Sequence, residues 1–195
     1  MNQGFLNPDE ILKQLKLKKE MIAADFGSGS GGWALPLAKK LEEGTIYAID
    51  ILEEPLSALR ARAKLEKILN IETIRADVEK RTPLSSNSVD LVLMTDLLFE
   101  CEDKKVVLEE GKRVLKLGGK ILIVDWKISA PLGPEDRRVS PQDIKKIAEE
   151  IGLKIEKRST RAKLGAGPVP HRNKVSGAGE FTAGAYHYAL VFTKP

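Results

Sequence analysis

Residues 25–40, "DFGSGSGGWALPLAKK", decide how the fold is interpreted. Glycines alternate with small residues directly after an apolar run that ends near Asp25, and an amphipathic helix pattern begins at residue 32. Glycine lets a backbone approach a ligand closely, and the first turn of a helix presents unpaired N–H groups. The stretch therefore predicts a ligand held against the main chain, at a point where a buried strand meets a helix.

Strand and helix patterns alternate along the rest of the chain. The strand patterns lie at 19–26, 44–50, 71–77, 88–96, 120–126, 153–159 and 186–194. The helix patterns lie at 7–15, 32–42, 53–70, 103–119 and 140–152. We expect Gly118 and Gly119 to end the fourth helix. Such alternation predicts an α/β fold with a doubly wound parallel sheet. Since no helix separates the last two strands, we expect them to form an antiparallel pair at one edge.

Acidic residues follow the predicted second and third strands. Ligands of open α/β sheets bind outside the carboxyl ends of the strands. Asp50 lies about 20 residues after the glycine stretch, where a carboxylate accepts hydrogen bonds from ribose hydroxyls. Asp77 is placed to receive an adenine amino group. An adenosine-containing ligand would use the glycine stretch and both acids.

The glycine spacing alone fits two classes of ligand. Gly27, Gly29 and Gly32 satisfy the dinucleotide pattern G-x-G-x-x-G. Gly27, Gly29 and Gly31 satisfy G-x-G-x-G, a pattern of S-adenosylmethionine binders. A tight turn without a ligand is the structural alternative.

A family resemblance rests on the order of four motifs. These are "DFGSGSG" at 25–31, "AID" at 48–50, "RADVEKRTPLSSNSVDLVLMTDLLF" at 75–99 and "VLKLGGKILIVDW" at 114–126. The chain resembles class I S-adenosylmethionine-dependent methyltransferases, closest to the ubiquinone- and menaquinone-biosynthesis type and related small-molecule enzymes. The resemblance implies a Rossmann-like, doubly wound, seven-stranded sheet that is mostly parallel with an antiparallel last strand. It also implies S-adenosyl-L-methionine as the cofactor.

The resemblance assigns cofactor contacts residue by residue. It places Asp25, Gly27, Gly29 and Gly31 along the methionine part, Asp50 on the ribose, Ile51, Asp77 and Val78 around the adenine, and Thr95 and Leu97 near the methyl group. This cofactor has no pyrophosphate, which agrees with the absence of Lys and Arg from the glycine loop at 27–32.

No fixed catalytic constellation is expected, because methyl transfer from a sulfonium depends mostly on positioning. A general base is needed only when the nucleophile still carries its proton. Asp96 and His187 are the weak candidates, with a turn cap and a core position as their structural alternatives. Trp126 is a candidate wall of the acceptor site. With one cysteine, Cys101, and two histidines, we expect no metal site.

The amino-acid composition indicates the expected cellular location and kinds of partner of the protein. No run of 18 apolar residues suggests a membrane span, and the N-terminus shows no export signal, so a cytoplasmic protein is expected. The net charge of +4 is uneven, since residues 154–174 carry seven Lys and Arg against Glu156. That segment has a charge of +6, which leaves −2 for the rest. A nucleic-acid-binding face across the body is therefore not indicated.

We expect one methyltransferase domain over 1–195, with an N-terminal helix within 1–20. The departure from the family pattern is the long, basic, Gly- and Pro-rich hairpin connection at 159–185. It fits a lid over the acceptor site, a binding arm, an inserted segment or a solvated hairpin tip.

The leading hypothesis is methyl transfer from S-adenosylmethionine to an unidentified small-molecule acceptor. One alternative is a methyltransferase-like fold that binds RNA or another partner through the basic arm at 157–174. The other is an NAD-dependent oxidoreductase that uses the same glycine pattern. The oligomeric state is left open.

Overall fold

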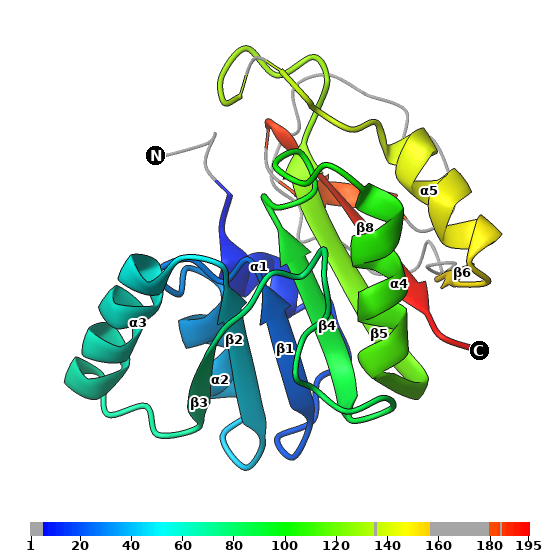
Figure 1. The fold of residues 1–195 in the computed structure, drawn as a ribbon. Coiled ribbons are helices and arrows are strands. Elements are labelled where there is room, and N and C mark those ends of the chain that lie inside the picture. The colour runs from blue at the N-terminus through cyan, green and yellow to red at the C-terminus, as the bar shows by residue number, and fades with distance from the viewer. Residues whose placement is uncertain (1–5, 135, 157–179, 184) are drawn as a thin grey trace, which may run out of the picture.

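A computed structural model describes residues 6–134, 136–156, 180–183 and 185–195, and shows a mixed sheet between two helical layers (Figure 1). The strands are β1 Ile22–Phe26, β2 Thr45–Asp50, β3 Ile71–Arg75, β4 Val89–Thr95, β5 Leu115–Trp126, β6 Lys154–Ile155, β7 Glu180–Ala183 and β8 His187–Thr193. The helices are α1 Pro8–Leu12, α2 Ala34–Lys40, α3 Glu53–Leu65, α4 Lys104–Val114 and α5 Pro141–Glu150.

The strand order confirms the predicted architecture. Along the sheet the order is β3-β2-β1-β4-β5-β8-β6, and β7 pairs with β8 off this path. Strands β1 to β5 pair in parallel, whereas β8 runs antiparallel to both β5 and β6. The order reverses between β1 and β4, which is the switch point where doubly wound sheets bind ligands.

Alternating side chains divide the core into two layers. In β4, Val92 and Met94 belong to the core beneath α4 and α5, whereas Leu91 and Leu93 belong to the core beneath α1, α2 and α3. Successive strand residues point to opposite faces, so both faces of this strand are buried. Figure 1 shows the two helical layers on opposite sides of the sheet.

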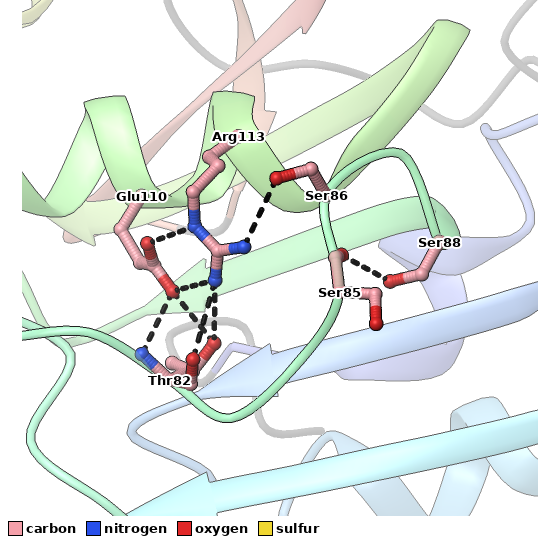
Figure 2. Close-up of polar contacts among 6 residues, drawn as sticks. All are labelled: Thr82, Ser85, Ser86, Ser88, Glu110 and Arg113. Carbon is pink, nitrogen blue, oxygen red and sulfur yellow. Dashed lines mark hydrogen bonds and ion pairs between the residues drawn. The ribbon is translucent and has the colours of Figure 1, made fainter.

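The loop before β4 is fastened to α4 by a buried polar cluster (Figure 2). The backbone N–H and the hydroxyl of Thr82 both donate to Glu110 Oε1, at 2.8 and 2.6 Å. Arg113 donates to both carboxylate oxygens of Glu110 at 2.7 Å, and to Ser86 Oγ at 3.3 Å. Burial acts to raise the pKa of Glu110, but hydrogen bonds from Arg113 and Thr82 outweigh it and lower this pKa. The "TPLSSNS" and "RVLKLGG" motifs that carry the family resemblance thus contact each other.

The expected end of the fourth helix was wrong. Helix α4 ends at Val114, and the two glycines at 118–119 lie inside β5, where the register with β4 shifts. Lys194, near the C-terminus, satisfies the carbonyl groups that a C-cap glycine would otherwise help to satisfy. Its Nζ donates to the carbonyls of Lys112 and Leu115 at 2.8 Å, and its own carbonyl accepts from Gly118 at 2.8 Å.

The predicted hairpin connection at 159–185 is only partly described. Residues 157–179 and 184 lie outside the described ranges, and the basic arm at 157–174 falls among them. Strand β7, which the sequence did not predict, pairs antiparallel with β8. Within the described ranges, no helix is long and apolar enough to cross a membrane.

Candidate cofactor site

The glycine loop, residues 27–32 after β1, is joined to the end of β2 by hydrogen bonds. The N–H groups of Gly27 and Ser28 donate to the carbonyl of Ile49, at 2.8 and 2.9 Å. The next N–H that points to β2, from Gly29, donates to Asp50 Oδ2 at 2.9 Å. Asp50 Oδ1 also accepts from Leu52 N–H at 2.9 Å. Asp50 therefore fixes the start of α3 and the glycine loop at the same time.

A cavity of about 420 Å³ opens at these strand ends. Its lining comes from the glycine loop and from the segments after β2, β3 and β4: Gly27, Gly29, Asp50, Ile51, Leu52, Pro55, Ala76, Asp77, Val78, Glu79, Asp96, Leu97, Glu100 and Cys101. The volume lies in the range of about 300–1,000 Å³ that is usual for small-molecule and cofactor sites.

Most of the predicted cofactor residues line this cavity, and three do not. Asp25 and Thr95 are buried beneath it, at 0% and 6% exposure. Gly31 faces the helical layer, where an added Cβ would lie 2.3 Å from Leu59 Cδ1. Its role in this structure is the close packing of the loop against α3.

Asp25 is the most unusual carboxyl group of the site. It is fully buried at the end of β1, and neither of its oxygens has a hydrogen-bond partner among the residues that the structure describes. Burial, and next the charge of Asp50, raises the pKa of Asp25 to about 8. Ser28 Oγ, in the glycine loop, is likewise buried with no partner in the described part of the chain. Buried polar groups normally have partners, so these atoms fit a polar ligand beside the loop.

The cavity lining is acidic. Asp50, Asp77, Glu79, Asp96 and Glu100 contribute carboxyl groups, and the part of the lining that the structure describes includes no Lys or Arg. Burial, followed by the charges of Asp50 and Asp96, raises the pKa of Glu100. A cleft lined by one sign of charge concentrates ligands of the opposite sign. The site therefore favours a cationic ligand and disfavours a pyrophosphate.

Sequence reasoning did not assign Leu52, Pro55, Ala76 and Glu79 to the site, although they flank the predicted strand-end residues. Their positions next to Asp50 and Asp77 were the only available signal. Cys101 also lines the cavity, but burial raises the pKa of its thiol to about 12. Such a thiol is a poor nucleophile, which agrees with a packing role.

The two weak catalytic candidates lie next to each other, although 91 positions separate them in the sequence. His187 Nε2 lies 3.1 Å from Asp96 Oδ1, beside the end of the cavity that β4 provides. The ring of Trp126, whose residue pairs with His187 across β5 and β8, lies 4.1 Å from the imidazole between centroids. Sequence reasoning named these residues singly and gave no means of pairing them.

The domain family described as "Methyltransferase domain" matches residues 24–123. This match covers β1 to β5 with the cavity, and more than half of the chain. The chain belongs to this methyltransferase family.

Curated relatives carry a more specific name. Demethylmenaquinone methyltransferases of Shouchella clausii and Staphylococcus aureus are each 29% identical to the chain. The matches run over 117 and 116 residues, which are 60% and 59% of this chain and 49% and 47% of those proteins. The chain spans about half the length of the curated relatives that it matches.

Solved structures extend the likeness to nearly the whole chain. An S-adenosylmethionine-dependent methyltransferase from Aquifex aeolicus is 26% identical, with a TM-score of 0.79 over 97% of this chain and 90% of that one. Haemonchus contortus phosphoethanolamine N-methyltransferase 2, in complex with S-adenosyl-L-methionine, is 18% identical, with a TM-score of 0.72 over 96% of this chain and 52% of that one. At that identity the second likeness shows the fold alone.

Proposed function

We propose that the protein binds S-adenosyl-L-methionine and transfers its methyl group to a small-molecule acceptor. The single observation that carries the proposal is the acidic cavity between the glycine loop and Asp50, at the switch point of the sheet. Family membership supports the same reaction. When bound, the cofactor supplies an electrophilic methyl group on a sulfonium sulfur.

The residues present fit the parts of this cofactor. Asp77 and Val78, with Ile51, would hold the adenine, and Asp50 would hold the ribose through its remaining lone pairs. Gly27 and Gly29 would lie along the methionine part, where a side chain would obstruct the ligand. These assignments follow from the family resemblance, and all of these residues line the cavity.

Charge supports this cofactor over a dinucleotide. The sulfonium and the ammonium group outweigh the carboxylate, so S-adenosylmethionine has a net positive charge near neutral pH. NAD instead carries a pyrophosphate, and no Lys or Arg lines the cavity to neutralise it. Among the described residues, therefore, the lining gives the NAD-dependent alternative no support.

For the acceptor, we propose a small, neutral or cationic molecule with an aromatic or apolar body. The acidic lining opposes anions, and the aromatic ring of Trp126 packs against His187, which lies next to Asp96 of the lining. Relatives of the chain are named demethylmenaquinone methyltransferases, and that name supports an acceptor of this kind. We further propose that the reaction takes place in the cytoplasm. The RNA-binding alternative depends on residues 157–174, which lie outside the described ranges.

Calorimetric titration with S-adenosylmethionine, S-adenosylhomocysteine and NAD tests the proposal. We expect saturable one-site binding of the first two and no heat of binding from NAD. Binding of NAD alone, or of none of the three, would overturn the proposed cofactor. In the second case, titration with a labelled single-stranded RNA at several salt concentrations would test the remaining alternative, because binding through a basic arm weakens steeply with salt.

A further inference from the structure

Asp96 has an unusual backbone and an exposed position at the cavity. It follows β4 directly, lines the cavity, and has a φ of 50°, in the left-handed region that residues other than glycine rarely adopt. Such conformations cost about 1–3 kcal/mol and gather at functional sites. Its Oδ1 atom is buried, so Oδ2 is the carboxylate oxygen that remains accessible from the cavity.

His187 lies next to this carboxylate, and its imidazole makes no hydrogen bond within the described structure. The residue is 5% exposed, and neither ring nitrogen has a hydrogen-bond partner there. Its Nε2 is 3.1 Å from Asp96 Oδ1, which is ion-pair distance, but the atoms are not aligned as in a hydrogen bond. Catalytic hydrogen bonds often align only when the reactants are bound. A small rotation of Asp96 would complete this one.

A third titratable group faces the same point. Asp125, at the end of β5, is 1% exposed, and its Oδ2 has no hydrogen-bond partner. Burial is the main cause that raises the pKa of Asp125 to about 7, and the charge of Asp96 also raises it, whereas His187 lowers it. Glu100, from the segment after β4, adds a further acidic group that interacts with Asp96. Titratable groups at the ends of β4, β5 and β8 thus interact electrostatically around Asp96.

The aromatic wall beside His187 is held rigidly. The ring of Trp126 is tilted by 44° to the imidazole, and the backbone of Gly133 lies against the same indole, where an added Cβ would be 2.5 Å from Cε3. Arg138 fixes this loop, because its guanidinium donates to the carbonyls of Ala130 at 2.6 Å and Leu132 at 2.9 Å. The position of the imidazole is therefore determined on one side by packing.

The reacting atoms would lie near Asp96 if the proposed function holds. With the adenine at Asp77 and the ribose at Asp50, the sulfur and its methyl group lie beyond the ribose. Under the proposed binding mode this part of the cofactor lies along Gly27, and Asp96 and Leu97 belong to the same cavity lining. An acceptor must approach the methyl group from the side opposite to the sulfur, so it meets the accessible oxygen of Asp96.

We propose that Asp96 accepts the proton of a hydroxyl or amine acceptor, and that His187 positions the Asp96 carboxylate for this step. As the proton moves to Asp96 Oδ2, the electron pair that it leaves behind strengthens the nucleophile. The nucleophile forms the new bond to the methyl carbon, and the electron pair of the broken carbon–sulfur bond stays on sulfur. The products are the methylated acceptor, a neutral thioether and a protonated Asp96, which releases its proton to water. This inference rests on the proposed function and adds the class of acceptor.

A panel of labelled-methyl transfer assays tests the inference after cofactor binding has been measured by calorimetry. The proton-bearing probes are 1,4-dihydroxynaphthalene, catechol and tryptamine, and the probes without a proton on the nucleophilic atom are nicotinamide and thioanisole. We expect transfer only to members of the first group. Asp96→Asn should lower kcat at least 100-fold and abolish its fall at acidic pH, a much larger effect than its loss of cofactor affinity, which we expect to be less than tenfold. His187→Gln should lower kcat about tenfold with little change in KM.

Glu102→Gln is the matched control, because it removes one exposed carboxylate close to the site that does not line the cavity. It should behave like the wild type. The inference is overturned if a cofactor-binding protein methylates only nicotinamide or thioanisole, methylates no probe, or retains its rate and pH profile in Asp96→Asn. Melting temperatures with S-adenosylhomocysteine exclude loss of folding as the cause of an effect. Failure of the cofactor titration itself would instead refute the proposed function.

Discussion

Asp50 Oδ2, at the end of β2, accepts a hydrogen bond from the backbone N–H of Gly29 at 2.9 Å. This contact joins residues 21 positions apart, and it places the carboxylate and the glycine loop on the same cavity. Each Asp50 oxygen already accepts one backbone N–H, and a carboxylate can accept about four hydrogen bonds. Asp50 therefore keeps acceptor capacity for two hydroxyl groups of a ligand.

Asp50→Ala is expected to weaken S-adenosylmethionine binding by roughly 1–3 kcal/mol, since hydrogen bonds to a buried polar ligand are lost. Glu54→Ala is the control, because it removes an exposed carboxylate from the first turn of α3, outside the cavity. Calorimetry on both variants gives the comparison. Equal affinity in the Asp50 variant and the wild type would refute the ribose role.

Two glycines of the loop are expected to respond differently to alanine. Gly29 has a φ of 51° and open space around its missing Cβ, and it lines the cavity. Gly29→Ala should therefore weaken cofactor binding more than tenfold, while the left-handed backbone costs only about 1 kcal/mol of stability. Gly31 has a φ of 89°, and a Cβ there would collide with Leu59.

Gly31→Ala should consequently destabilise the fold by about 2–4 kcal/mol, from overpacking and backbone strain together. Urea unfolding and calorimetry on both alanine variants separate the two roles. We assign ligand contact to Gly29 and packing against α3 to Gly31. If both variants lost the same stability and the same cofactor affinity, this assignment would be contradicted.

Stability is expected to fall as the pH rises from about 4 to 8. Burial raises the pKa of Asp25 from its ordinary value of 3.8 to about 8. In this window the folded protein keeps a proton that the unfolded chain has released. The free energy of unfolding then decreases by up to about 1.4 kcal/mol per pH unit. The raised pKa of Asp125, about 7, acts in the same direction over the lower part of the window.

Asp25→Asn removes the Asp25 contribution and should flatten the dependence on pH, most visibly between about pH 7 and 8. Urea unfolding of the wild type and the variant across the window measures it. A variant whose slope matches that of the wild type would show that Asp25 is ionised in the folded protein.

The Glu110–Arg113 pair is expected to matter far more than a surface pair of the same spacing. Glu110 is 6% exposed, so Arg113→Leu leaves a buried carboxylate without its cation, at a cost of about 3–5 kcal/mol. Lys13 and Glu10 form an exposed pair with the same three-residue separation. Lys13→Leu should therefore lower the free energy of unfolding far less than Arg113→Leu does. Similar losses in both variants would show that burial of the first pair is incomplete.

The local pattern of apolar and polar residues was sufficient to predict the sheet, because its strands are short apolar runs separated by amphipathic helices. It failed at Gly118 and Gly119, where the glycines indicate a helix end but lie in a distorted part of β5. The carbonyls at the end of α4 are satisfied by Lys194, about 80 positions away. A window of sequence around the helix holds no information about such a partner.

Most residues that line the cavity could be predicted for a related reason: the carboxyl ends of parallel strands meet at one edge, and Asp50 and Asp77 lie at strand ends. The roles of Asp25 and Gly31 could not be separated from those of Gly27 and Gly29, since burial depends on the helices that pack above the loop. The contact between Asp96 and His187 arises only when β8 inserts beside β5. Pairing across the sheet, not spacing along the chain, creates it.

A crystal structure with S-adenosylmethionine bound tests the central claim most directly. We predict the adenine between Ile51 and Val78, both ribose hydroxyls within hydrogen-bond distance of Asp50, and the methyl group directed toward Asp96. Well-defined cofactor elsewhere, or in this cavity with its ribose away from Asp50, would contradict the account.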